Sequence, residues 1–265
     1  MVTRHIKRQN VFSKGIDAFF EEIAEIARFT INVFREGVKP PYELREVLNQ
    51  CYEIGIKSFL LVGITAFVLG LVLILQSRPT MVEFGAGAFL PSMSSISIVR
   101  EIGPLITALI CAGKIGSGIS AELGSMKVTE QIDAMEVSGT NPFKYLVATR
   151  IIATTLMIPV LTVYADLISM MGAFTGANIK DEVNIGFYFN RVFEALSFND
   201  VIPAFTKTFF FGFAIGLIGC AKGYNSKKGT EGVGKAANAS VVIAMLSVII
   251  IDMVVTQISS MLGYL

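Results

Sequence analysis

The sequence predicts an all-α membrane protein, with an N-terminal interfacial amphipathic helix followed by five transmembrane helices. Hydrophobic residues make up 53% of the 265 residues and charged residues 16%, whereas a soluble domain would have about 25% charged residues. Five apolar segments are each close to the roughly 20 residues that cross a bilayer. The formal net charge of +1 gives no indication of nucleic-acid binding.

The N-terminal helix is expected over residues 14–36, where apolar side chains recur at helical spacing and charged ones occupy the other face. In a membrane protein, such a helix is expected to lie in the headgroup plane; packing on a soluble partner is the alternative. A second amphipathic piece, at 44–54, leads into the first span. We therefore predict a cytoplasmic or interfacial segment at 1–56 and a transmembrane domain at 57–265.

The spans themselves are predicted near residues 57–76, 102–121, 148–176, 203–221 and 238–262. Pro159 predicts a kink in the third span. The Gly212-x-x-x-Gly216 spacing in the fourth span indicates either close helix contact or chance in a glycine-rich chain.

Orientation follows from the basic residues of the connecting segments. The segment up to and including Lys57 contains nine Lys or Arg residues, and the connection between the fourth and fifth spans contains four more. Since cytoplasmic loops carry the excess of Lys and Arg, the N-terminus and the 122–147 loop are predicted to be cytoplasmic and the C-terminus to lie on the outer side of the membrane.

Three ionisable residues, Lys114, Asp166 and Asp252, fall near the midpoints of their predicted spans. Each would cost about 2.5–3.5 kcal/mol at a helix centre, so Lys114 is expected to pair with Asp166 or Asp252. We favour a structural ion pair; a proton or ion relay is the alternative. The single histidine, His5, lies in the N-terminal tail and supplies no further relay group.

Arg100 and Glu101 stand at the outer end of the second span, just before Gly103-Pro104. Proline removes a backbone donor and disturbs the preceding turn, which predicts a kink here. Glu101 would then face a cavity, or it would form an interfacial charge pair with Arg100; the sequence leaves both interpretations open.

A short amphipathic helix is predicted in the 122–147 loop. Its apolar side carries Val128, Ile132, Ala134 and Met135, and the opposite side is polar. This pattern favours an element that docks another protein, although an ordinary connecting helix has the same pattern. The chain has no P-loop, no cysteine spacing typical of a metal site and no Ser/His/Asp set, so we expect no enzyme activity, metal or cofactor.

Several motifs resemble those of one family. They are R-E-I-G-P at 100–104, A-G-K-I-G at 112–116, A-E-L-G at 121–124, T-E-Q-I-D-A-M-E at 129–136 and E-G-V-G at 231–234. The chain resembles, over roughly residues 15–262, the MlaE (YrbE)-type permeases, which are the membrane subunits of ABC systems that work with MCE-domain proteins in bacterial lipid transport. Lys114 replaces a more usual arginine, which weakens a bidentate pair with an aspartate.

The resemblance implies a homodimer in the bacterial inner (cytoplasmic) membrane. Two cytoplasmic ABC ATPase subunits would each hold one coupling helix, at about 126–138, and a ring of periplasmic MCE-domain protein would cover the other side. The family also leaves room for a small cytoplasmic STAS-type accessory. The substrate would be a phospholipid held in an outward-facing cavity between the two copies.

Site residues follow from these expectations. The lipid-binding residues are predicted to be Leu71, Leu75, Gln76, Glu101, Ile102 and Leu105, and Val248 is expected to face bulk lipid. The residues that couple to the ATPase are predicted to be Thr129, Glu130, Gln131, Asp133, Met135 and Glu136. The alternatives are an ion-coupled secondary transporter and a non-transporting membrane anchor.

Overall fold

The computed structural model describes residues 24, 26–35, 43–179, 183–227 and 229–263. The chain divides into two units, Met1–Tyr42 and Glu43–Leu265. In the first unit, residues 26–35 are helical. They fall within the predicted helix at 14–36, whose remaining residues, apart from Ala24, lie outside the described residues. The placement of this helix in the headgroup plane stays a prediction.

The second unit confirms the five predicted spans. Five of its helices are long and apolar enough to cross a membrane: Leu44–Glu83, Gly87–Val128, Phe143–Asn178, Phe198–Tyr224 and Thr230–Met261. All begin before the predicted apolar segments, because polar residues at their ends continue the helices. The amphipathic piece at 44–54, for example, joins the first span in one helix, α2 (Leu44–Glu83).

The second span combines several helical segments and contains two π-helical turns. Its parts are η1 (Gly87–Phe89), α3 (Leu90–Ser97), η2 (Ile98–Ile102), α4 (Gly103–Cys111), η3 (Ala112–Gly116) and α5 (Ser117–Val128). In η2 the Gly103 N–H donates to the Ile98 carbonyl, five residues back. Pro104 has no N–H to extend the regular ladder, so the disturbance predicted before it takes the form of this wider π turn.

The third and fourth spans pack closely. The third consists of η4 (Phe143–Ala148) and α7 (Thr149–Asn178), which stays helical through Pro159. The fourth is α9 (Phe198–Tyr224). A Cβ added at Gly212 or Gly216 would collide with Thr154 on α7. The Gly-x-x-x-Gly spacing therefore does serve close helix contact, as one of the two interpretations predicted.

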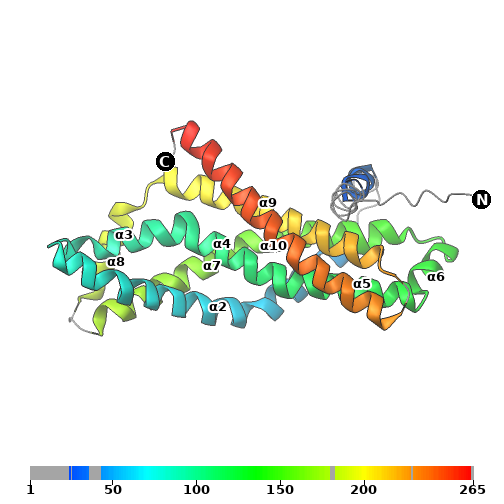
Figure 1. The fold of residues 1–265 in the computed structure, drawn as a ribbon, viewed down its shortest axis with the longest axis horizontal. Coiled ribbons are helices and arrows are strands. Elements are labelled where there is room, and N and C mark those ends of the chain that lie inside the picture. The colour runs from blue at the N-terminus through cyan, green and yellow to red at the C-terminus, as the bar shows by residue number, and fades with distance from the viewer. Residues whose placement is uncertain (1–23, 25, 36–42, 180–182, 228, 264–265) are drawn as a thin grey trace, which may run out of the picture. The chain divides into compact units, whose positions relative to one another are not determined.

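The remaining helices mark the two ends of this unit (Figure 1). An unpredicted helix, α8 (Ile185–Ala195), lies beside α3 at one end, and α6 (Gln131–Val137) lies at the other. The Asn184 side chain caps α8 by accepting hydrogen bonds from two backbone N–H groups. Tyr188 and Val192 of α8 are fully buried in a core shared with α2, α3 and α7.

The last span, α10 (Thr230–Met261), leaves most of its apolar surface exposed, but Val248 is fully buried. The prediction that Val248 faces bulk lipid is therefore wrong. Its neighbour Leu246 is 56% exposed and takes that position instead. The error arose because hydropathy alone does not show which face of a uniformly apolar helix packs inward.

Candidate functional site

A buried lysine on α9 is the centre of a charge cluster between the spans. The side chain of Lys207 is 3% exposed, and its ammonium lies 2.8 Å from both Glu101 Oε2 and Asp252 Oδ1. Thr256 donates its hydroxyl to Glu101 Oε1 at 3.2 Å. We call Glu101, Lys207, Asp252 and Thr256 the Lys207 cluster. It joins η2, α9 and α10, and the pairing offsets the cost of placing charges inside a membrane protein.

Arg100 has a different partner from its neighbour Glu101. Its guanidinium pairs with Asp200 on the first turn of α9. Asp200 also accepts hydrogen bonds from the backbone N–H of Ser197 at 2.8 Å and from the Ser197 hydroxyl at 2.7 Å. The proposed Arg100–Glu101 pair is thus replaced by two separate pairs to α9, because adjacent residues of a helix project in different directions.

The space beside these two pairs is small. A cavity lined by Arg100, Glu101, Asp200 and Lys207 has a volume of about 20 Å³, which is enough for about one water molecule. The cavity between the two pairs therefore has no room for a larger ligand, while the Glu101 side chain itself is 42% exposed.

The predicted pairing of Lys114 with Asp166 or Asp252 is wrong in this structure. Asp252 pairs with Lys207, and the Lys114 ammonium donates to the carbonyl of Lys57. Lys114 follows Glu101 by 13 residues, which corresponds to about 20 Å along a helix. Lys207 was missed because it lies near the start of the predicted fourth span. The sequence did contain a signal for this pair, because Lys207 lies inside one apolar span and Asp252 inside the next.

Asp166 lies close to the Lys207 cluster but outside its ion pairs. Its carboxylate rests against Gly103 of α4, where an added Cβ would collide with it. Within the described part of the chain, its Oδ1 is buried without a hydrogen-bond partner. The structure thus places Asp166 at a close crossing of α4 and α7, and a relay role for it stays a prediction.

The predicted lipid-binding residues lie where α2 passes the start of α4. Ile102 lines a narrow pocket together with Val62 and Leu69 of α2. Further along α2, Leu71 is partly buried, whereas Leu75 and Gln76 are exposed. Leu105 is partly buried on α4. Lipid binding by this set stays a prediction.

The predicted coupling helix is shorter than 126–138. Glu130 has a left-handed backbone, φ 58°, and separates α5 from α6 (Gln131–Val137). Ile132 is fully buried and Met135 partly buried, while Thr129, Glu130, Gln131, Asp133 and Glu136 are exposed. Ala134, predicted to lie on the apolar side, is exposed as well. α6 therefore has one anchored residue and a largely polar open surface.

Lys127 connects α6 to the end of α5. Its ammonium lies 2.9 Å from Asp133 Oδ1. The same ammonium lies 6.0 Å from the centroid of the Tyr224 ring at the end of α9, a distance at which cation–π attraction operates. One lysine thus holds α6 against two spans, and sequence analysis had not singled it out.

Comparisons with known proteins agree on one family. The family model described as Permease MlaE matches residues 47–258. The chain is 36% identical to a probable ABC transporter permease protein of Rickettsia typhi, over 94% of this chain and 96% of the relative. A probable ABC transporter permease protein of Synechocystis is 32% identical, over 89% and 90% of the two chains. The intermembrane phospholipid transport system permease protein MlaE of Haemophilus influenzae is 31% identical, over 80% and 82%.

Proposed function

Since the chain belongs to the MlaE permease family of ABC transporter membrane subunits, we propose that it moves phospholipid between the bacterial inner membrane and a periplasmic MCE-domain ring. ATP hydrolysis would take place in a separate ABC ATPase subunit. The observation that supports phospholipid as the substrate is the similarity to a relative that is named as a phospholipid transport permease. The lysine-rich segments support an N-terminus in the cytoplasm and a C-terminus in the periplasm.

In this proposal α6 receives the ATPase. Its exposed residues, Thr129, Glu130, Gln131, Asp133 and Glu136, form the docking surface, and partly buried Met135 lies at the edge. The Lys127–Asp133 ion pair ties this surface to α5. Because α5 is the end of the second span, displacement of α6 would be transmitted along one helix to Glu101.

The lipid site would lie at the opposite end of that span, between two copies of the chain. Leu71, Leu75, Ile102 and Leu105 would contact acyl chains, and Gln76 and Glu101 would lie near the headgroup. Lys207 pairs with Glu101 in this structure and weakens the repulsion that a bare carboxylate would exert on a phosphate, although the same ammonium also pairs with Asp252. Opening of the dimer would bring the phosphate to the Lys207 ammonium, which would keep its pairs with Glu101 and Asp252.

The test is ATP-driven lipid transfer by the purified complex in proteoliposomes. Glu130→Lys/Glu136→Lys is expected to lower lipid-coupled ATP hydrolysis while membrane insertion is retained. The control is Glu43→Lys/Glu231→Lys, which changes the charge equally at two exposed residues near the α6 end. Full coupled activity in the first variant would remove α6 from the mechanism.

The same assay separates the proposal from its two rivals. Transfer that requires a proton gradient and ignores ATP would favour an ion-coupled transporter with Lys114, Asp166 and Asp252 as the relay. Absence of any lipid transfer, with the complex intact, would favour a membrane anchor. A second copy, the MCE ring and a STAS-type accessory would be identified by mass of the complex extracted in native lipid.

A further inference from the structure

A polar cavity lies at the α6 end of the spans, away from the Lys207 cluster. Its volume is about 390 Å³, within the roughly 300–1,000 Å³ that is common for ligand pockets. The first turns of α2 form one wall, and η3 and α5 form the other. Its polar lining side chains are Asn49, Gln50, Glu53, Lys57, Ser58, Lys114 and Glu122.

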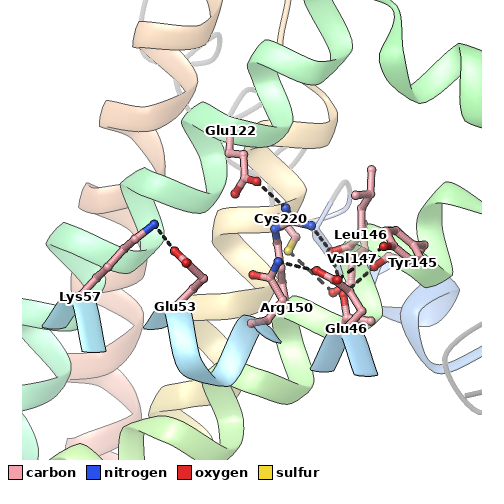
Figure 2. Close-up of polar contacts among 11 residues, drawn as sticks. Glu46, Glu53, Lys57, Glu122, Tyr145, Leu146, Val147, Arg150 and Cys220 are labelled. Carbon is pink, nitrogen blue, oxygen red and sulfur yellow. Dashed lines mark hydrogen bonds and ion pairs between the residues drawn. The ribbon is translucent and has the colours of Figure 1, made fainter. Parts of the chain in front are cut away.

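The lining carries charges of both signs at separate places. Lys57 pairs with Glu53 along α2. Lys114, which donates to the Lys57 carbonyl, has no carboxylate partner among the residues that the structure describes. Glu122 stands on the opposite wall, 56% exposed, and Arg150 binds it from behind at 2.8 Å. Figure 2 shows the Glu53–Lys57 pair on one side and the Glu122–Arg150 pair on the other.

Arg150 fixes the position of Glu122. The guanidinium of Arg150 is 3% exposed and also donates to the Leu146 carbonyl at 2.9 Å. A buried arginine with two partners has little freedom to move, so it holds the Glu122 carboxylate at the cavity. One oxygen of that carboxylate remains available to a cationic group.

Ser58 is a second, independent indication of a ligand. This residue lines the cavity and is 1% exposed, and over the described parts of the chain its hydroxyl has no hydrogen-bond partner. A buried hydroxyl without a partner costs free energy. A bound group with an oxygen acceptor would remove that cost.

An apolar groove adjoins the cavity at Lys114. It has a volume of about 490 Å³ and is lined by Leu61, Ile106, Leu109, Ile110 and Met245, with Lys114 at its edge. Lys114 thus lines both the polar cavity and the apolar groove. A ligand that fills both has a charged head and an extended apolar part.

We propose that this cavity and groove bind a zwitterionic phospholipid from the leaflet at the α6 end. The phosphate binds Lys57 and Lys114 and accepts a hydrogen bond from Ser58, and the headgroup ammonium binds Glu53 and Glu122. The acyl chains occupy the groove. This inference rests on the proposed function for its ligand class, and it adds a second lipid site, about 20 Å along the second span from Glu101.

The test uses a photocrosslinking residue at Leu109, in the groove, and another at Leu105, in the predicted outer site. The complex is reconstituted in vesicles of equimolar phosphatidylethanolamine and phosphatidylglycerol, and captured lipid is identified by mass spectrometry. Position 109 is expected to capture phosphatidylethanolamine preferentially. Lys114→Met with Glu122→Gln should lower that capture about a hundredfold, about tenfold for each of the two lost charge-assisted contacts, and leave capture at position 105 unchanged.

Lys235→Met is the matched control, because it removes an exposed lysine at the same end but outside the cavity. Lys114→Arg keeps the charge and should retain capture at position 109. Size-exclusion chromatography checks that the double variant is folded. A Ser58→Ala variant should show weaker capture of both lipids, since the hydroxyl serves the phosphate they share.

Several results would overturn the inference. Equal capture at position 109 with and without Lys114 and Glu122 would show that bulk lipid fills the groove. Crosslinks from position 109 to a second copy of the chain would make the groove a subunit interface. Protection of position 109 by inorganic phosphate, with no phospholipid captured there, would identify a cytosolic anion instead of a lipid. If position 105 captures no lipid in the complex that carries no other substitution, the proposed function is contradicted instead.

Discussion

Replacement of Lys207 by methionine is the most direct test of the charge cluster. The substitution keeps an unbranched side chain of similar length and removes the ammonium that pairs with Glu101 and Asp252. Both carboxylates then lack their cation. The side chain of Asp252 is 15% exposed and that of Glu101 is 42% exposed, so most of the cost falls on Asp252.

The expected size of the effect follows from that burial. Removal of one partner from a buried ion pair costs about 3–5 kcal/mol, because the remaining charge is left uncompensated. For a chain of this size, such a loss lowers the melting temperature by roughly 10 °C. Lys207→Met/Asp252→Leu should recover most of it, since the charge that was stranded is gone. Lys207→Met/Glu101→Gln should recover less, because water reaches Glu101.

Buried thiols supply the assay. Cys111 and Cys220 are both fully buried, so a thiol-reactive dye reports their exposure as the detergent-solubilised protein is heated. Cys51, which is partly buried, sets the baseline. Lys235→Met, at an exposed i,i+4 pair, should melt like the unaltered protein. The reasoning fails if Lys207→Met melts at the temperature of the unaltered protein. It also fails if Lys207→Met/Asp252→Leu melts no higher than Lys207→Met.

Three further outcomes are expected. Gly103→Ala should destabilise the protein by roughly 1–3 kcal/mol, because the new Cβ collides with the Asp166 carboxylate on α7. Gly118→Ala meets open space and should be neutral. Equal melting temperatures of the two variants would contradict this. Lys127→Met should loosen α6 and lower lipid-coupled ATP hydrolysis at unchanged insertion, and unchanged coupling would exclude Lys127 as its anchor. A photocrosslinker at Leu105 should capture a defined phospholipid, while one at exposed Leu246 should capture lipids in proportion to their abundance; identical capture profiles would remove the outer site.

The sequence predicted those features that depend on local pattern. Five apolar segments of sufficient length predicted five spans, and the spacing of Ile132 and Met135 predicted a helix in the loop. The Gly212-x-x-x-Gly216 spacing offered close helix contact as one of two interpretations. These features are set by composition and periodicity within one helix, which is why the predictions held.

Pairing between helices was not predictable in the same way. Lys114 and Asp252 each fall near the middle of an apolar segment. The middles of two segments need not lie at the same depth in the membrane. Asp252 lies on α10, a long helix whose first turns are polar and precede the apolar part. The depth of Asp252 relative to Lys114 therefore depends on how the helices pack. Val248 was misplaced for a related reason, because an apolar helix has no sequence signal for its buried side.

The position of the π turns connects the two polar regions. Arg100 and Glu101 lie in η2, and Lys114 lies in η3 of the same span. A π turn contains one residue more than a regular turn, and such turns are frequent at functional sites. A change between π and α geometry would rotate the charged side chain relative to its neighbours without breaking the helix. The charged residues of the second span at the Lys207 cluster and at Lys114 therefore lie where its backbone departs from regular α geometry.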